Sequence, residues 1–412
     1  MTTNPTQPNA LLHDQRLADH TLVIPTYNRP SLLKQLVAYL ADRARPMPLL
    51  VLDSSADAEA AAENAKSVAP HAAFARYVPF PSNVPMAAKL AAGLTSVTTS
   101  TASFCADDDL VFAPAIARAL HFLDAHPDHV SAHGLYFNFG EHGHDIHIMG
   151  EYAGRSIEAE HPGARLFQLM QSYESLFYGV FRTTDLHDIL TNVAELPSLH
   201  YQELFQSSAA LMLGKVARLP EFYAARRSGP AAEPTRDKWQ TYYWFAESPG
   251  EFVEHYLAYR EKLWDFYSAH VAEPHLTRAD FDRILDICHA MYFSNACPPA
   301  YFHSVLQAYW PKDAFDEREH DIFAERGGSR VRKPAGGLEV FLDHVQSWLA
   351  SRRRFTPSAD VRGALESLNA QVRALGHTAW NCRIVSELGW LARDEDFRTC
   401  YRELCRYLDA AP

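Results

Sequence analysis

Three adjacent aspartates, Asp107, Asp108 and Asp109, follow a short apolar run in the stretch FCADDDL. Neighbouring carboxylates repel one another, and a buried carboxylate without a partner raises its pKa and becomes neutral. The three acids must therefore lie in water, cap a helix or share a cation. Because carboxylate oxygens are the ligands that Mg²⁺ and Mn²⁺ prefer, binding of a divalent cation is the chemistry these residues suggest.

A helix cap and a solvated turn are the two simpler explanations of the triplet. Proline is favoured in the first turn of a helix, so Pro114 indicates a helix capped near Ala113, with the acids upstream of the cap. A solvated turn stays open, but it does not explain why the acids follow a strand-like run. We therefore predict a divalent-metal site at the triplet.

The segments before the triplet alternate between strands and helices. Four apolar runs predict strands, namely HTLVIP, LLVLD, FARYVPF and TASFCA, and a helical pattern follows each of them. Short connections between such elements are typical of a mostly parallel sheet sandwiched by helices, which is an α/β fold.

Polar residues follow three of these strands. PTYNR comes after the first strand, Asp53-Ser54-Ser55 after the second, and the aspartate triplet after the fourth. In parallel sheets ligands bind beyond the carboxyl ends of the strands, so we expect these three segments to form one cleft.

Residues 140–165 are rich in Gly and His and only weakly periodic, which predicts a long loop or flap. The stretch contains four potential metal ligands, Glu141, His142, His144 and His147. Zinc ligands need a rigid frame, and glycine interrupts this stretch, so we interpret these residues as polar loop residues.

The second half of the chain has a helical, aromatic-rich pattern from about residue 240, as in EFVEHYLAYREKLWDFY and LEVFLDHVQSWLASRRR. The run Arg352–Arg354 is interpreted as a basic helix end that complements the dipole, and residues 324–337 as a basic exposed loop. We predict three parts of the chain: a flexible tail over 1–16, a catalytic domain over 17–235, and a C-terminal, mainly α-helical domain over 236–412.

Composition narrows the class of protein. The chain has 412 residues, 47% apolar content and a net charge of −12, which suits a large core and argues against a nucleic-acid surface. The N-terminal segment lacks the pattern of a signal peptide, and no apolar run has the length of a membrane span, although peripheral membrane contact stays open. The six cysteines are scattered, so we expect a reduced, cytoplasmic protein.

The motif PTYNRP, a strand ending in Asp53 and the acidic triplet together resemble the inverting family 2 glycosyltransferases, which have the glycosyltransferase A fold. The resemblance covers roughly residues 17–230. It implies a nucleotide-sugar donor across the strand ends, with a ligand set in this sequence of Pro25, Thr26, Tyr27 and Arg29 near the nucleoside, Asp53 on the base and Lys89 on the nucleotide. It also implies that Asp107 contacts the ribose, that Asp107 and Asp109 hold Mn²⁺ or Mg²⁺, and that Asp108 lies between these roles.

Sugar transfer also needs a base that deprotonates the acceptor hydroxyl. The family has an acidic pair at the head of a helix where this chain has Gln202-Glu203, so the resemblance implies Glu203 as the base. A glutamate in the first helical turn is also ordinary dipole complementation, and Glu174 and Asp185 are the alternatives. The resemblance further places Arg182 at the donor-sugar pocket, and we predict that Arg227 binds the diphosphate.

The predicted function is a metal-dependent inverting transfer of one sugar from a UDP-type donor to a hydroxyl of a glycan or glycoconjugate, in bacterial surface polysaccharide synthesis. Processive relatives carry a QxxRW motif, and this chain has only RDKWQ. Three alternatives stay open: a DxD-type phosphohydrolase, a nucleotidyltransferase and a non-catalytic nucleotide-binding platform. Against the first two, Leu110 and Val111 follow the triplet where a phosphohydrolase has Gly and Thr, and no glycine-rich phosphate loop follows the first strand.

Overall fold

The computed structural model describes residue 11 and residues 14–44, 47–228, 248–271, 276–296, 359–376 and 380–410. The predictions that lie outside these residues concern most of the N-terminal tail, the boundary at 235/236, RDKWQ, Cys297, the loop over 324–337 and the helix over 338–354 with Arg352–Arg354. Among the described helices, none combines the length and apolar character needed to cross a membrane.

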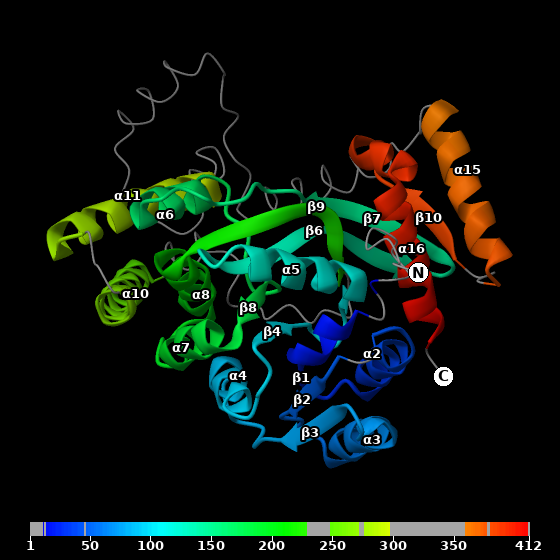
Figure 1. Cartoon of the computed structure of the whole chain (residues 1–412), viewed down its shortest axis with the longest axis horizontal. Helices are drawn as coiled ribbons and strands as arrows, with labels where there is room; N and C mark the ends of the chain where they lie inside the picture. Colours follow the sequence, from blue (N-terminus) through cyan, green and yellow to red (C-terminus); the bar gives the residue numbers. More distant parts are fainter. Residues whose placement is uncertain are drawn as a thin grey trace, which may run out of the picture.

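The first part of the chain forms the predicted strand–helix alternation (Figure 1). Its elements are β1 (His20–Thr26), α2 (Pro30–Arg43), β2 (Leu49–Asp53), α3 (Ala58–Val68), β3 (Ala75–Pro79), α4 (Met86–Leu94) and β4 (Thr101–Phe104). Strand β1 pairs in parallel with β2 and with β4, and β2 pairs in parallel with β3. The prediction of a parallel sheet is therefore confirmed for this part.

The sheet continues with strands of mixed direction. The next elements are β5 (Leu110–Val111), α5 (Ala113–Ala125), β6 (His129–His142), β7 (Asp145–Tyr152), α6 (Pro162–Gln171), β8 (Val180–Arg182), α7 (Thr183–Val193), α8 (Leu199–Leu213) and β9 (Lys215–Arg227). The order across the sheet is β10-β7-β6-β8-β4-β1-β2-β3, and β9 pairs with β5 and β6. Strand β8 runs antiparallel to both β4 and β6, so it reverses the strand direction in the middle of the sheet.

Alternate residues of the strands enter two separate hydrophobic cores. Leu22 and Ile24 of β1 belong to one core with helices α2, α5 and α16, whereas Val23 belongs to the other with α4, α7 and α8. Because side chains alternate across a strand, each face of the sheet must be covered by helices. This explains why the strands read as continuous apolar runs.

Residues 140–165 differ from the prediction of a long loop. Strands β6 and β7 form an antiparallel hairpin that turns at Gly143, whose φ is 60°. The end of the hairpin is exposed on both faces and carries polar residues and glycine. The sequence there therefore lacks the apolar alternation that predicts a strand. Glu141 and His142 of β6 and His147 of β7 lie near the end of this hairpin, and within the described part of the chain no three His, Cys, Asp or Glu groups lie close enough to hold a metal by themselves.

The C-terminal region is mainly helical, as predicted, but it also contributes to the sheet. Its described elements are α10 (Pro249–His270), α11 (Arg278–Ala296), α15 (Ala359–Ala374), β10 (Asn381–Ile384), the 3₁₀ helix η4 (Ser386–Arg393) and α16 (Glu395–Asp409). Strand β10 pairs in parallel with β7, and α16 packs against α2 and β9 (Figure 1). Residues far apart in the sequence therefore share one core.

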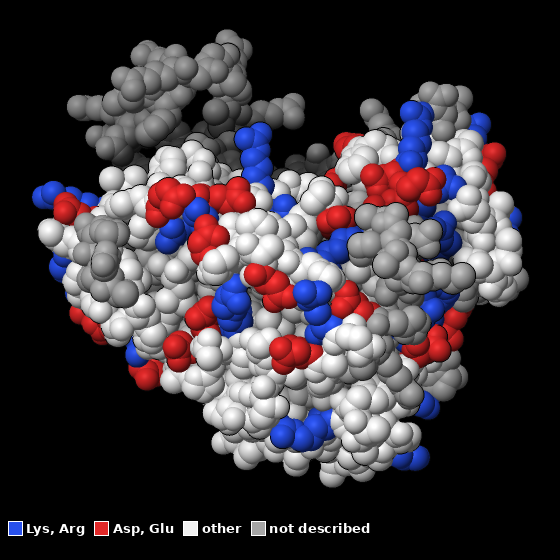
Figure 2. Space-filling view, in the orientation of Figure 1, with Lys and Arg blue, Asp and Glu red and all other residues white. Residues whose placement is uncertain are grey.

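On the face of the molecule in Figure 2, Lys and Arg side chains are interspersed with Asp and Glu side chains. The five described cysteines are buried free thiols.

Candidate active site

The carboxyl ends of β1, β2 and β4 lie side by side. Thr26 is opposite Asp53 in the register of β1 and β2, and β4 lies on the other side of β1. The Thr26 hydroxyl donates a 2.6 Å hydrogen bond to Asp107 Oδ2. The three segments predicted to form a cleft therefore meet at one edge of the sheet.

Side-chain hydrogen bonds fix the loop after β1. Asn28 has a φ of 53°, a conformation that asparagine tolerates better than most residues. Its N–H donates to Ser55 Oγ at 2.8 Å, and its Oδ1 accepts from the N–H of Asp57 at 3.0 Å. The next residue, Arg29, precedes α2 and turns toward the triplet, whereas Tyr27 is 47% exposed.

Arg29 bridges two of the three aspartates. Its Nη1 lies 3.2 Å from Asp107 Oδ1 and 2.9 Å from Asp108 Oδ2. All three aspartates are buried, with exposed fractions of 3%, 7% and 5% along the triplet. One guanidinium does not balance three ionised carboxylates, and the charges of Lys89 and Arg226 also act on Asp107 and Asp109.

The third aspartate faces β9. Asp109 Oδ2 accepts a hydrogen bond from the Tyr178 hydroxyl, and Oδ1 accepts from the N–H of Arg227 at 2.7 Å. The pairing of β5 with β9 produces this contact, because it brings the residues after β4 beside the end of β9. The triplet is thereby held between two loops and a distant strand.

Asp107 and Asp109 are suitable ligands for a divalent metal. Burial raises the pKa of each carboxyl to about 6, and the charge of Asp108 adds to the rise. A carboxylate oxygen has two lone pairs, so an oxygen that accepts one hydrogen bond can still bind a metal. Magnesium is commonly held by one or two carboxylates with phosphate and water as the other ligands. The donor set therefore fits Mg²⁺ or Mn²⁺.

Asp53 is fully engaged by its own surroundings. Its Oδ1 accepts from the N–H and hydroxyl of Ser55 at 2.7 and 2.6 Å, and its Oδ2 accepts from Asn64 Nδ2 at 2.8 Å and the Tyr77 hydroxyl at 2.7 Å. These four bonds use the acceptor positions of a carboxylate. A nucleobase would have to displace one of these donors to form a hydrogen bond with Asp53. The contact between Asp53 and the nucleobase therefore stays a prediction.

Lys89 is buried next to the same strand ends. Its Nζ donates to Thr26 O at 3.1 Å and to Ser54 Oγ at 2.8 Å. Burial lowers the pKa of Lys89, although the negative charges of Asp53 and Asp107 act to raise it. An ammonium carries three protons, so one is left for a ligand.

A cavity of about 690 Å³ adjoins these strand ends. Pro25 at the end of β1 and Ala106 before the triplet line it, and so do Glu203 of α8 and Tyr178. Since Tyr178 also contacts Asp109, the cavity and the triplet share a wall. Its volume is within the range of roughly 300–1,000 Å³ that is typical of ligand pockets.

Glu203 has the environment of a general base. The Tyr173 hydroxyl donates to Glu203 Oε1 at 3.2 Å. Burial raises the pKa of Glu203, although the Tyr173 hydrogen bond and the charge of Arg226 oppose the rise. A carboxylate with a raised pKa in a cavity is suited to accept a proton from a hydroxyl.

The two alternative bases are less well placed. Glu174 lines the same cavity, but it is paired with Arg218, whose side chain is only 6% exposed. Asp185 lies in the first turn of α7 and does not line the cavity. Glu203 is therefore the most available carboxylate.

Arg226 is a candidate site residue, although the sequence analysis chose its neighbour Arg227 from the same pair. It lines the cavity, stacks against Tyr152 and Tyr178 with its guanidinium carbon 5.6 and 5.4 Å from the ring centres, and its buried Nε has no partner among the described residues. Burial disfavours its charge, but Tyr178 and Asp109 outweigh that effect and raise its pKa. Arg226 is thus a cation between the base and the triplet.

Arg227, which we predicted as the diphosphate ligand, is held by protein groups. Its Nε donates to Asp108 O at 3.0 Å, Nη1 pairs with Glu141, and Nη2 lies 3.4 Å from Gln35 Oε1 and 3.5 Å from the Tyr407 hydroxyl. Adjacent strand residues point to opposite faces, so only one residue of the Arg226-Arg227 pair can face the cavity. The alternation indicates that the two arginines differ, and the structure shows that Arg226 lines the cavity.

Arg182 is not brought to this site. Tyr178 lies at the start of the segment that leads into β8, next to the triplet, but β8 runs antiparallel to β4 and places Arg182 opposite Thr101 at the other edge. There its Nη2 donates to Leu123 O at 2.9 Å, near the end of α5. The direction of β8, which the sequence pattern did not reveal, separates the two residues.

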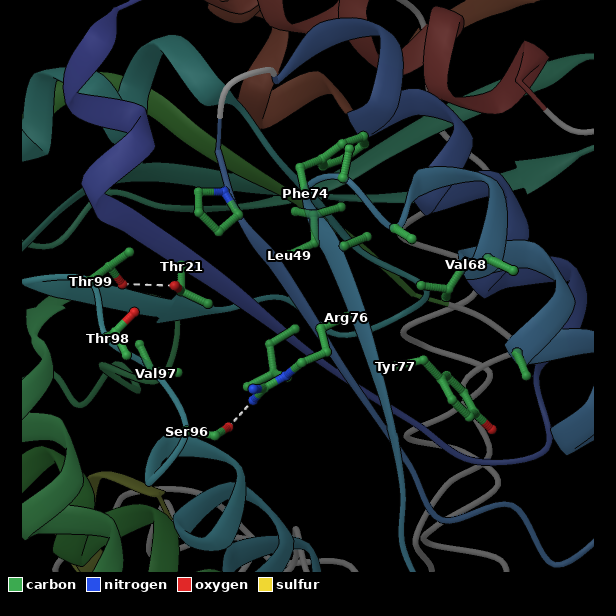
Figure 3. A pocket seen from close by; sticks show the side chains of 17 residues that line it. Thr21, Leu49, Val68, Phe74, Arg76, Tyr77, Ser96, Val97, Thr98 and Thr99 are labelled. Carbon is green, nitrogen blue, oxygen red and sulfur yellow. Dashed lines mark hydrogen bonds between the residues drawn. The ribbon is translucent and has the colours of Figure 1, made fainter.

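A second cavity, of about 610 Å³, lies at the amino edge of the parallel strands (Figure 3). Thr21, Leu49 and Arg76, from the starts of β1, β2 and β3, line it, and Arg76 donates to Ser96. Its wall is otherwise mostly apolar and hydroxyl side chains. It has none of the carboxylates of the first cavity.

The fold and the site together define the glycosyltransferase A class: a sheet sandwiched by helices, with an aspartate triplet at the carboxyl ends of its strands. Over residues 21–182 the chain matches the family described as "Glycosyl transferase family 2". It is therefore a glycosyltransferase, as the resemblance implied.

Solved structures with a similar course of the chain include Staphylococcus aureus TarS 1-349 in complex with UDP-GlcNAc, at 17% identity and a TM-score of 0.47, covering 67% of this chain and 72% of that one. A second is the mannosyltransferase PcManGT from Pyrobaculum calidifontis in complex with GDP-Man and Mn2+, at 13% identity and a TM-score of 0.43, covering 100% of this chain and 88% of that one. No curated protein matches the chain.

Proposed function

We propose that this glycosyltransferase transfers one sugar, with inversion and with the help of a divalent metal, from a UDP-type donor to a hydroxyl of a glycan or glycoconjugate. A role in the synthesis of bacterial surface polysaccharide is the setting that the family resemblance favours. One observation carries the proposal: Glu203 and Arg226 line a single cavity that reaches the strand ends beside the aspartate triplet.

The donor diphosphate is assigned to the strand ends. Thr26, Arg29 and Lys89 surround Asp107 there, and Lys89 has a proton available for an anionic ligand. The loops after β1 and β2 also lead into α2 and α3, whose N-terminal ends favour negative charge. These groups orient the diphosphate, and Asp53 stays the predicted contact to the nucleobase.

Asp107 and Asp109 would hold Mn²⁺ or Mg²⁺. When bound, such a cation acts as a Lewis acid that stabilises the charge developing on the departing diphosphate. Arg226 would add a fixed positive charge on the cavity side of Asp109, since both residues contact Tyr178. Pre-placed charge of this kind is worth several kcal/mol in a water-poor site, roughly 10²–10³ in rate.

Inversion requires one base on the side opposite the leaving group. Glu203 would take the proton of the acceptor hydroxyl, with Tyr173 holding its Oε1 in place. Glu174, the second carboxylate of the cavity, is neutralised by Arg218 and has no corresponding role. A single free carboxylate is what a direct displacement needs.

Nucleotide-dependent melting tests the proposal. We expect UDP to raise the melting temperature when Mn²⁺ is present and to have much less effect in EDTA. At a hundredfold excess of UDP over its Kd, binding should add about 2.7 kcal/mol to the free energy of unfolding. ADP, GDP and dTDP in the same assay test the preference for uridine.

Asp109→Asn is the matched variant, because it keeps the volume of the side chain and removes its charge. It should lose the Mn²⁺-dependent response, and because its amide nitrogen cannot accept one of the two hydrogen bonds that Asp109 accepts, its melting temperature without nucleotide should be somewhat lower. If no nucleoside diphosphate stabilises the wild-type protein with or without metal, the donor assignment is wrong. Release of phosphate from simple esters would instead support the phosphohydrolase.

A further inference from the structure

The cavity beside Glu203 has two chemically different ends. Glu203, Arg226, Glu174 and Tyr173 make one part of its wall polar. Helices α4, α7 and α8 contribute an apolar part, consisting of Met86, Leu90, Leu190, Val193 and Leu199. Since α4 packs against α7 and α7 against α8, these side chains form one continuous surface.

The apolar surface is core on its inner side and becomes accessible at Met86. Leu90, Leu190 and Val193 are at most 2% exposed and have core neighbours on their other side, but Met86 is 46% exposed. An exposed apolar side chain at the edge of a cavity costs free energy in water, and a bound apolar group would remove that cost. The wall offers no partner for a phosphate or a hydroxyl.

The helix that carries Glu203 also presents polar atoms without partners. Gln206 lines the cavity one turn after Glu203, is 4% exposed, and its Nε2 has no hydrogen-bond partner among the described residues. Gln202 lines it as well, and its Oε1 is unpartnered in the same sense, while its Nε2 donates to Leu196 O at 2.6 Å. Both amides lie in the cavity wall beside the Glu203 carboxylate, and these two unpartnered atoms are buried in it.

We infer that the acceptor is amphipathic: a hydroxyl-bearing head group at Glu203 and Gln206, joined to an apolar chain or ring that lies against Met86, Leu90 and Val193. The inference rests on the proposed function, because the presence of the base in the cavity makes its occupant the acceptor. The polar groups of the donor would bind at Arg29 and Lys89 instead. The apolar wall is therefore available to the acceptor.

Binding of methyl, butyl and hexyl β-D-glucoside, measured calorimetrically with UDP and Mn²⁺ present and below the micelle concentration, tests the inference. Each methylene that reaches the wall should lower Kd about fourfold, so hexyl glucoside should bind at least tenfold more tightly than methyl glucoside. Equal affinities of the three glucosides would overturn the inference.

Met86→Glu and Met86→Gln place a polar group on the apolar surface at an exposed position, so both should fold. We expect the preference for hexyl over methyl glucoside to fall below about twofold in both variants. Met86→Leu should keep the preference, and so should Ile287→Glu, which changes a 62% exposed residue of α11 outside the cavity.

A chain-length preference that persists in Met86→Glu would mean that the alkyl chain binds elsewhere, and the inference would be wrong. The UDP and Mn²⁺ melting response of the same samples separates the two proposals. A normal response without any chain-length preference rejects the amphipathic acceptor alone, whereas loss of the response in wild-type protein rejects the donor assignment.

Discussion

The two edges of the parallel strands carry cavities of similar size and opposite character. The cavity at the carboxyl edge is about 690 Å³ and contains Glu203 and Arg226, and the cavity at the amino edge is about 610 Å³ and contains Arg76 among apolar and hydroxyl side chains. Volume therefore does not distinguish an active site in this molecule. The carboxylates do, since Asp107, Asp109 and Glu203, whose pKa values are raised by burial, lie at the first edge, whereas no Asp or Glu among the described residues lines the second cavity.

Strand direction explains the difference. The loops that leave β1, β2 and β4 all begin at the carboxyl edge, so every polar residue after a strand accumulates there. Helices α2 and α3 begin at this edge as well, and their N-termini favour anions. The amino edge receives the ends of helices and the first residues of strands, which this sequence fills with apolar and hydroxyl side chains.

Among the changes at the two edges of the sheet, removing the base Glu203 at the carboxyl edge should reduce sugar transfer the most. Glu203→Gln keeps the shape of the side chain but cannot accept a proton, so we expect kcat for sugar transfer to fall by roughly 10²–10⁴. Donor binding, measured by the melting response to UDP and Mn²⁺, should stay within twofold. Unchanged turnover would assign the base to Glu174, and Glu174→Gln tests that directly.

The two adjacent arginines should differ from each other. Arg226→Met removes the cation of the cavity, so we expect kcat/KM to fall by roughly 10²–10³ with little loss of stability. Arg227→Met removes hydrogen bonds to Asp108 O and Glu141, so we expect unfolding free energy to fall by about 2 kcal/mol. The reverse pattern, with Arg226 structural and Arg227 kinetic, would contradict this division.

The pH dependence of the reaction should follow the environment of Glu203. Burial raises its pKa, so the acid limb of kcat/KM should lie at higher pH than for an exposed glutamate, and activity should rise as the carboxyl ionises. Tyr173→Phe removes a hydrogen bond that lowers this pKa, so the limb should move further up. A limb that stays in place in Tyr173→Phe would mean that another group controls it.

The amino edge should respond least. Arg76 is exposed and contacts Ser96 only through its side chain, so Arg76→Ala should change kcat/KM by less than about twofold and stability by less than about 0.5 kcal/mol. Sugar transfer and chemical unfolding of the variant are the measurements. A tenfold loss of activity would show that the two edges are coupled, and the contrast between them would fail.

Much of the fold was predictable because it rests on local patterns. The runs before residue 110 formed the strands and helices expected from their spacing, and the parallel pairing of β1, β2 and β4 follows from short connections. The hairpin of β6 and β7 was not predicted, since its exposed end carries polar residues and glycine on both faces. Strand β10 is only four residues long and gives too weak a pattern to be recognised.

The site residues divide in the same way. The convergence of Thr26, Asp107 and Arg29 follows from strand order, and the structure contains it. Whether Arg226 or Arg227 lines the cavity depends on which face of β9 meets the cavity. Arg182 lies away from the active site because β8 runs antiparallel to β4. Both are matters of pairing between distant strands.

By itself the sequence determined the order of strands and helices and the identity of the acids that follow them, because hydrophobic periodicity and turn residues act over a few positions. Only the tertiary structure decided which of those residues share a cavity, which are already satisfied by hydrogen bonds as Asp53 is, and which are buried enough to have a raised pKa. The physical reason is that solvation and charge interaction depend on distances through space, and these are set by strand direction and by helices such as α16 that return from the far end of the chain.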